Sequence, residues 1–229
     1  MIDPVLANPA WHALRGPQAA VAEGGPLAFR YQPDVALFAA LPDDPTTEAW
    51  DQLGDVVGPG GYAFLARDVV PPRLGWEQVV SVAAVQMVAT SVDGELDDNA
   101  QRLSVDDVTE ILALVERTEP GPFGPRTIEL GEYFGIRDDD GDGALIAMAG
   151  ERMFPSPYRE ISAVCTDESH RGKGLAARLV RHLVARIHER GETPILHARE
   201  DNANAIRLYE HLGFTHSNLF TVTGYRAPT

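Results

Sequence analysis

The chain has 229 residues, of which 44% are hydrophobic and 23% charged, a composition typical of a globular protein with one large domain or two small ones. Its formal net charge of −15 at pH 7 argues against nucleic acid as a partner, because nucleic-acid binding needs a basic surface. No apolar run reaches the ~20 residues that span a bilayer, so we expect no membrane partner either.

The cysteine content and the N-terminus predict the compartment. Cys165 is the single cysteine of the chain, which excludes an internal disulfide and is typical of a reducing environment. The first residues lack the basic-then-apolar pattern of a secretory signal. We therefore expect a cytoplasmic protein.

Residues 1–97 are rich in Pro, Gly and Ala, and they carry no motif that indicates chemistry. Their short apolar runs predict strands or short helices between turns: LAFRY, VALFAAL, GYAFLARD and VVSVAAVQMVA. The acidic stretch SVDGELDDNAQ, residues 91–101, is typical of a linker. We predict an N-terminal accessory lobe over 1–97 and a main domain over 98–229.

Stronger local signals begin after residue 101. Ser104 is the expected N-cap of a helix, with Asp107 three residues later as its capping partner. The apolar stripe of this helix is predicted to be Val108, Ile111, Leu112 and Val115. The segment GPRTIELGEYF predicts a short helix, and residues 133–153 predict a hairpin of two strands around the acidic turn DDDGDG.

The last third of the chain alternates between strands and helices. The runs EISAVCT, TPILHA and NLFTVTGYR predict strands. Between the first two, a strongly amphipathic helix should end at Gly191, with its apolar face made of Leu175, Leu179, Leu183 and Ile187. The segment DNANAIRLYEHLGF predicts another helix, with Asp201 or Asn202 near its N-cap.

The acidic turn does not fit a calcium-binding loop. Asp138, Asp140 and Asp142 match the first three ligand positions of an EF-hand and Gly143 its glycine, but Ala149 stands where a bidentate glutamate is required. The histidines have no metal-ligand spacing and no zinc signature is present. We expect no metal.

The segment SHRGKGLA, residues 169–176, is the best candidate for an anion site. Lys173 is the only lysine of the chain, and it lies between two glycines in a turn that follows a strand and opens a helix. Backbone N–H groups at such a helix start stabilise phosphate oxygens. The surrounding basic run, opposed only by Glu189, comprises Arg171, Lys173, Arg178, Arg181, Arg186 and Arg190. A solvated arginine face is the alternative interpretation of that run.

Two other nucleotide motifs fit less well. A Walker A loop is excluded because Gly174 and Leu175, rather than Ser or Thr, follow Lys173. The run Gly172–Ala177 does fit G-x-G-x-x-A of a dinucleotide-binding fold, but polar residues separate it from the strand and Glu200 lies too far along the chain. The dinucleotide interpretation stays open as an alternative.

RGKGLA matches R/Q-x-x-G-x-G/A, and NANAIRLYEHLGF matches N-x-x-A-x-x-L-Y-x-x-x-G-F. In this order, with a strand before each helix, the motifs over 98–229 resemble the GNAT superfamily of acetyl-CoA-dependent N-acetyltransferases. From Glu160 onward the chain also resembles the subgroup related to glycine N-acyltransferases. The resemblance implies an α/β (α+β) fold with a mixed, mostly antiparallel central sheet flanked by helices. Residues 1–97 are then at most a partial, degenerate GNAT-like lobe.

The resemblance implies roles for individual residues toward acetyl-CoA. Backbone amides would hold the pyrophosphate at Arg171, Gly172, Lys173, Gly174, Leu175 and Ala176. The backbone of Val164, Cys165 and Thr166 would pair with the pantetheine arm, where their strand and TPILHA splay apart. Asn202 would contact the pantetheine from the next helix.

Two residues are the implied catalytic groups. Tyr209 would give a proton to the departing thiolate, which a phenol with a pKa of ~10 can do while it stays neutral at pH 7. Glu160 would act as the base for the acceptor amine. The alternatives are that Tyr209 packs between helix and sheet and that Glu160 pairs with Arg159 or another arginine. Strand alternation places the Cys165 side chain opposite Glu160 and toward the core, as an inert thiol.

Two functions remain possible from the sequence. One is acetyl transfer to a primary amine of a small molecule or a peptide, by direct attack on the thioester. The other is a catalytically silent acetyl-CoA-binding regulatory module. A homodimer is a possible assembly, and the sequence does not name the acceptor.

Overall fold

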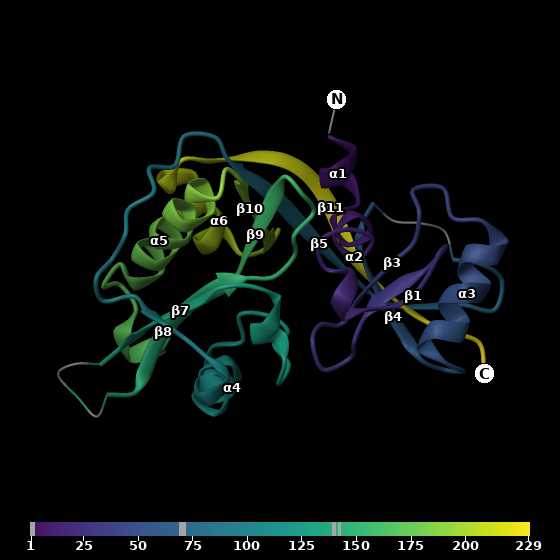
Figure 1. The fold of residues 1–229 in the computed structure, drawn as a ribbon, viewed down its shortest axis with the longest axis horizontal. Coiled ribbons are helices and arrows are strands. Elements are labelled where there is room, and N and C mark those ends of the chain that lie inside the picture. The colour runs from purple at the N-terminus through teal and green to yellow at the C-terminus, as the bar shows by residue number, and fades with distance from the viewer. Residues whose placement is uncertain (1–2, 69–71, 139–140, 142) are drawn as a thin grey trace.

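The computed structural model describes residues 3–68, 72–138, 141 and 143–229. In these residues eleven strands form one open sheet in the order β1-β2-β3-β4-β11-β5-β10-β9-β8-β7-β6 (Figure 1). The pairs β3–β4 and β9–β10 are parallel, and the other pairs are antiparallel. This mixed, largely antiparallel sheet with helices on its faces confirms the expected fold class.

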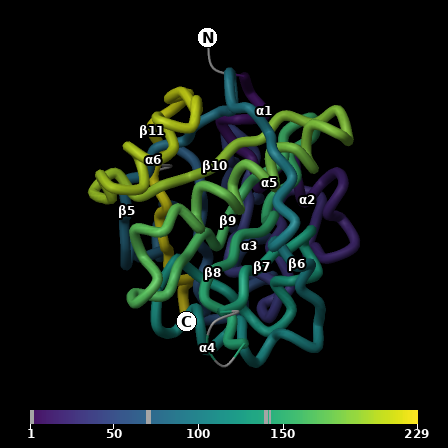
Figure 2. The backbone as a smooth tube through the Cα atoms, turned by 90° about the vertical axis from the view of Figure 1, so that its left-hand side faces the viewer, coloured from purple at the N-terminus to yellow at the C-terminus, as the bar shows by residue number. Residues whose placement is uncertain are grey.

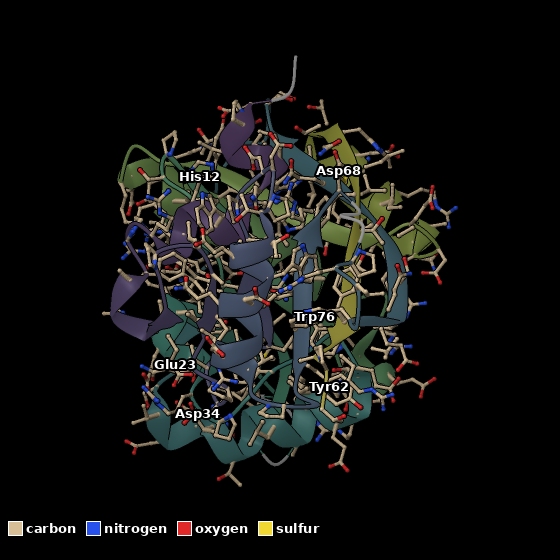
Figure 3. The ribbon with its side chains drawn as sticks, turned by 90° about the vertical axis from the view of Figure 1, so that its right-hand side faces the viewer. His12, Glu23, Asp34, Tyr62, Asp68 and Trp76 are labelled. Carbon is tan, nitrogen blue, oxygen red and sulfur yellow. The ribbon has the colours of Figure 1, made fainter. Side chains whose placement is uncertain are left out.

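All four apolar runs contribute strands to the N-terminal half of the sheet, and one further strand lies before them in the chain. The strands of this half are β1 (Ala22–Gly24), β2 (Phe29–Tyr31), β3 (Phe38–Ala40), β4 (Tyr62–Arg67) and β5 (Glu77–Ala89). Its helices are α1 (Pro4–Ala7), α2 (Pro9–Leu14), the 3-10 turn η1 (Ala19–Val21) and α3 (Thr47–Val57). The ring centroids of Trp50 on α3 and Trp76 lie 5.1 Å apart. Figure 3 shows this side of the protein, with Trp76 labelled.

The other half follows the predicted order of elements. Its strands are β6 (Gln101–Arg102), β7 (Tyr133–Arg137), β8 (Leu145–Glu151), β9 (Tyr158–Thr166), β10 (Thr193–Arg199) and β11 (Phe214–Arg226). Its helices are α4 (Val108–Thr118), α5 (Leu175–Glu189) and α6 (Ala203–Leu212), with 3-10 turns η2 (Val105–Asp107), η3 (Thr127–Leu130) and η4 (Glu168–His170). The hairpin β7–β8 is confirmed. Asp140 and Asp142 of its acidic turn lie outside the described residues.

Each long helix buries its apolar face against the sheet. On α5 the predicted leucines are buried, and Leu179, Leu183 and Ile187 have no exposed surface. On α4 the capping box of Ser104 and Asp107 is present, but the buried residues are Ile111 and Leu114, while Leu112 is only half-buried. The predicted stripe is confirmed at Ile111 and at Val108 and Val115, which pack partly buried against the same cluster. It is wrong at Leu112, because Leu114 is the residue that faces the core. The segment GPRTIELGEYF forms the short 3-10 turn η3 rather than an α-helix, and its last two residues begin β7.

The long strands β5 and β11 connect the two halves of the sheet. They pair from Phe214↔Ala89 to Arg226↔Glu77, and Figure 1 shows this ribbon passing from the side of α5 and α6 to that of α3. The accessory lobe and the main domain therefore share one sheet, and their division near residue 97 stays a prediction. No helix in the described ranges is long and apolar enough to cross a membrane.

The predicted linker has no regular structure before Gln101 and lies along α5. Glu95 N–H donates to the Arg181 carbonyl at 3.1 Å. Asp97 accepts from Nε and Nη2 of Arg178 at 2.6 and 2.9 Å, and this pairing lowers the pKa of the Asp97 carboxyl. In Figure 2 the segment descends beside α5 toward β6.

Candidate functional site

Strand β10 ends before its two neighbours do. It pairs with β9 only as far as Leu196↔Ile161, although β9 continues to Thr166. On its other side it pairs with β5 as far as Arg199↔Ala84, while β5 extends back to Glu77. The expected splay of β9 and β10 is thus present, and backbone groups at the end of β9 face an open edge.

A β-bulge interrupts β9 at this point. Ala163 has φ +54°, a left-handed conformation, and the register with β8 jumps between Met148 and Gly150. The bulge resets the alternation of side chains. Val164 packs with the core under α5, whereas Cys165 belongs to the cluster under α4. Ile161 also packs with the core under α5, so its neighbour Glu160 points to the opposite face, which is the face of Cys165. The expectation that Cys165 and Glu160 lie on opposite faces is wrong.

A cleft of about 1080 Å³ opens where the strands diverge. One side is formed by β9, the loop before α5 and the start of α6. The opposite side is formed by strands of the N-terminal half, and the cleft is also lined by Thr118 at the end of α4 and residues 119–122 after it. Of the sequence-predicted residues, the cleft is lined by Val164, Cys165, Thr166, Arg171, Gly172, Gly174, Leu175, Ala176, Asn202 and Tyr209.

The loop before α5 leaves room for an anion. Gly172 and Gly174 have φ +79° and +75°, and a Cβ atom at either would meet nothing within 4 Å. The first amides of α5 have no partner within the helix, as at any helix start. The Arg171 amide, in contrast, donates to the Glu168 carbonyl at 3.3 Å, so Arg171 offers its side chain rather than its N–H. Space, N–H donors and charge together fit a pyrophosphate.

Most arginines of α5 do not contribute to this loop. Arg178 pairs with Asp97, and Arg186 and Arg190 both pair with Glu132. Arg190 also contacts Glu151. The basic run predicted from the sequence is therefore mainly neutralised by carboxylates. Arg171 and Lys173 are exposed and form no ion pair with the described residues.

Helix α6 brings two further groups to the cleft, Asn202 at its N-cap and Tyr209 in its C-terminal half. Asn202 caps α6, and its side chain accepts from Ala205 N at 3.1 Å. Tyr209 is only 7% exposed. Burial, with a smaller effect of Cys165, raises the pKa of Tyr209 to about 12. The phenol is therefore a stable proton carrier at neutral pH. Burial also raises the pKa of the Cys165 thiol, which fits the predicted inert cysteine.

Glu160 is completely buried and its carboxylate is fully engaged. Nε and Nη2 of Arg152 donate to Oε2 and Oε1 at 3.0 and 2.5 Å. The Met153 amide donates to Oε2 at 3.1 Å, and His197 Nδ1 lies 2.7 Å from Oε1. Burial alone would raise the pKa of Glu160, but Arg152 and then His197 lower it to about 2.

This arrangement matches the alternative that Glu160 pairs with an arginine. The partner is Arg152, since Arg159 pairs with Glu192 instead. Each oxygen of Glu160 has two donors, so neither is free to take a proton from a substrate. The structure gives no support to Glu160 as a base.

His197 links Glu160 to the N-terminal half. Because the ionised carboxylate can only accept, His197 Nδ1 carries the hydrogen. His197 Nε2 lies 2.9 Å from Nε2 of Gln86, which also donates to the Leu6 carbonyl at 2.9 Å. Sequence reasoning missed Arg152 and His197, because the contacts that give them a role join distant segments.

Comparison with known proteins shows which family the chain belongs to. A putative acetyltransferase from the GNAT family of Novosphingobium aromaticivorans is 38% identical, and the match covers 99% of this chain and 100% of that one with a TM-score of 0.88. The chain belongs to the GNAT family. The family model for FR47-like proteins matches residues 133–222. A GCN5-related N-acetyltransferase from Kribbella flavida, 17% identical over 98% of this chain and 96% of its own, has the same fold with a TM-score of 0.65.

Curated relatives match this GNAT protein over a shorter segment. Mycothiol acetyltransferase of Thermomonospora curvata is 37% identical over 75 residues, and that of Beutenbergia cavernae is 36% identical over 78 residues. These segments are 32% and 34% of this chain. The chain spans about a quarter of the length of these relatives, 25% and 26%.

A metal site was not expected from the sequence. Within the described ranges, no group of three or more His, Cys, Asp or Glu side chains is arranged to hold a metal ion. Part of the acidic turn lies outside those ranges, so the expected absence of a metal stays a prediction.

The engaged state of Glu160 leads to a stability prediction. Glu160→Gln leaves Arg152 buried without its counter-charge and should lower the free energy of unfolding by ~3–5 kcal/mol. Because the pKa of Glu160 falls from 4.5 to about 2 on folding, its contribution is complete above pH 4.5 and is lost as the pH falls to about 2. Urea unfolding of both proteins should show their difference shrinking over that window.

Glu129→Gln is the matched control. Glu129 also accepts from Nε and Nη2 of an arginine, Arg126, each at 2.7 Å, but both side chains are about 40% exposed. Its loss should cost less than ~1 kcal/mol. Equal losses in the two variants would contradict the assigned role of the Glu160–Arg152 pair.

Proposed function

We propose that this GNAT protein transfers an acetyl group from acetyl-CoA to a primary amine of a small molecule or a peptide, by direct attack of the amine. The observation that carries the proposal is the open glycine loop at the start of α5, beside the unpaired end of β9 and in the same cleft as Tyr209. GNAT acetyltransferases use acetyl-CoA as co-substrate, which supplies the acetyl group as a thioester.

The chain offers a distinct set of groups for each part of coenzyme A. The amides of Gly172, Lys173, Gly174, Leu175 and Ala176 bind the pyrophosphate, with Arg171 and Lys173 adding charge. Just after β9, the Asp167 N–H donates to the Ile146 carbonyl on β8 at 2.7 Å. Backbone groups alternate along a strand, so the backbone of Cys165 also faces β8. Val164 and Thr166 are then the two that pair with the pantetheine arm, and Asn202 contacts it from α6.

Tyr209 acts as the general acid. The amine nitrogen forms the new C–N bond to the thioester carbonyl carbon, and the C–S bond breaks. The Tyr209 hydroxyl donates its proton to the departing thiolate. The proton that the amine loses passes to water, because both oxygens of Glu160 are engaged. Glu160 is thus proposed as a positioning residue for Arg152 and His197 rather than as a base.

We do not infer the identity of the acceptor from the names of the relatives. The curated matches are named mycothiol acetyltransferases, but this chain aligns with only a quarter of their length. The glycine N-acyltransferase-like character of the C-terminal half, the cytoplasmic location and a homodimer stay predictions. A silent acetyl-CoA-binding module is the alternative outcome of the experiments below.

The first experiment tests the cofactor and the loop. Acetyl-CoA at 100 times its Kd should stabilise the protein by ~2.7 kcal/mol through mass action and so raise its Tm, whereas NADH should leave the Tm unchanged. Gly174→Val should abolish the acetyl-CoA shift, since a branched side chain fills the anion space at a φ of +75°. Thermal melts with and without each ligand measure this.

Gly191→Val at the far end of α5 is the control for backbone strain. Gly191 has φ +73° and also meets nothing within 4 Å, so a similar loss of Tm is expected in both variants. Only Gly191→Val should keep the acetyl-CoA shift. A retained shift in folded Gly174→Val would remove the loop from the mechanism, and an NADH shift without an acetyl-CoA shift would favour the dinucleotide interpretation.

The second experiment tests Tyr209 and separates an enzyme from a binding module. Tyr209→Phe keeps the ring and removes the proton donor, so single-turnover acetyl transfer should fall at least ~10-fold. Acetyl-CoA affinity should stay within a few-fold, because the hydroxyl matters once thiolate charge develops. Unchanged turnover would make Tyr209 a packing residue. Binding of acetyl-CoA by the unaltered protein, with no turnover on any amine, would indicate the silent module.

A further inference from the structure

The cleft extends beyond β9 onto the face of the N-terminal half of the sheet. The apolar side chains that form this wall are Leu37, Phe38, Phe64, Val80, Val82 and Val222. They come from β3, β4, β5 and β11 or the residue just before β3. Except for Val222, they lie outside the segment that matches the FR47-like family model. Most of the wall therefore lies outside the part of the chain that the FR47-like family model covers.

Arg152 is the cation beside this apolar wall. Its guanidinium carbon lies 4.8 Å from the ring centroid of Phe38. Nε and Nη2 are held by Glu160, so the plane of the guanidinium is fixed. The third nitrogen, Nη1, forms no hydrogen bond with any described residue, and the side chain lines the cleft with 13% exposure. Nη1 can thus donate to an oxygen atom of a molecule in the cleft.

The pairing with Glu160 does not remove this capacity. Burial alone would lower the pKa of Arg152, but the adjacent Glu160 carboxylate raises it above its usual value, so the guanidinium stays charged. A charge-assisted hydrogen bond from Nη1 to a carbonyl or carboxylate oxygen is stronger than one between neutral groups. An amine with many hydroxyl groups would instead place them against six apolar side chains, where they lack partners.

We infer that the acceptor is the α-amine of an amino acid or a peptide N-terminus with an apolar side chain, which packs on the wall while its carbonyl or carboxylate oxygen accepts from Arg152 Nη1. This inference rests on the proposed acetyl transfer. It names the acceptor class by two features, an apolar group and an oxygen next to the amine. The amine itself then lies toward the unpaired end of β9.

The unaltered protein tests both features with matched amines. Phenylalanine amide should be acetylated with a kcat/KM at least ~10-fold above that of glycine amide, which lacks the side chain. It should also exceed 2-phenylethylamine, which lacks the oxygen, by at least ~10-fold. Glucosamine should be a poor acceptor. Free phenylalanine and the dipeptide Phe-Ala distinguish a carboxylate source from a peptide carbonyl source.

Two neighbouring valines on β5 provide a matched pair of variants. Val80 and Val79 are 39% and 42% exposed, but only Val80 lines the cleft. Val80→Glu places a carboxylate on the apolar wall and should lower kcat/KM for phenylalanine amide at least ~10-fold. Val79→Glu should change it less than ~2-fold. Neither variant should change the Tm shift caused by acetyl-CoA.

Arg152→Lys tests the oxygen contact. A lysine keeps the charge next to Glu160 but has no planar fork, so it cannot bind Glu160 in two places and donate to a substrate as well. The kcat/KM ratio of phenylalanine amide to 2-phenylethylamine should therefore fall at least ~5-fold. We use this ratio because it does not depend on the fraction of the variant that is folded. An unchanged ratio would overturn the role of Nη1.

The outcomes separate this inference from the proposed function. Acetylation of glucosamine or glycine amide in preference to phenylalanine amide would overturn the inference and leave acetyl transfer intact. If acetyl-CoA binds and no amine is acetylated, titration of phenylalanine amide into the acetyl-CoA-saturated protein decides. The inference is supported if phenylalanine amide binds saturably and if Val80→Glu, but not Val79→Glu, weakens that binding. The absence of binding would overturn it.

Discussion

Strand β10 stops at Arg199 while its neighbours on both sides continue, and the cleft exists because no strand takes its place. The end of β9 on one side offers backbone groups, and the face beside β5 on the other offers apolar side chains. The junction is held by a buried polar chain from Arg152 through Glu160 and His197 to Gln86. These contacts join β9, β10 and β5 with the segment after β8. Under the proposed acetyl transfer, the same few residues position the cofactor side and the acceptor side.

Electrostatics divide the long helix α5 into two functional parts. Its C-terminal arginines, Arg186 and Arg190, pair with carboxylates and add to the solvated surface. The loop before its N-terminus keeps Arg171 and Lys173 without ion pairs among the described residues. An acidic protein can bind an acidic cofactor in this way, because local donors at ~3 Å outweigh a diffuse net charge that salt screens beyond ~8–10 Å.

Local signals in the sequence predicted the strands, the capping box at Ser104, the amphipathic helix α5 and the glycine loop, since each depends on residues close in the chain. The site was harder to predict. The bulge at Ala163 contains no glycine, so the sequence carries no signal for it. Regular alternation of side chains along the strand therefore predicted the wrong face for Cys165 relative to Glu160. The partners of Glu160 come from β10 and from the segment after β8, and no local pattern links them. Helix α3 was missed although Thr46 caps it.

The continuous ribbon of β5 and β11 has a mechanical consequence. Many two-sided clefts change width by hinge motion at a few loop residues. Here the two sides belong to one sheet, and widening the angle between them would break backbone hydrogen bonds along two 13-residue strands. The shared sheet therefore restrains the spacing between the open edge of β9 and the apolar wall. Under the proposed acetyl transfer, an acceptor would be selected by its length and shape against this spacing.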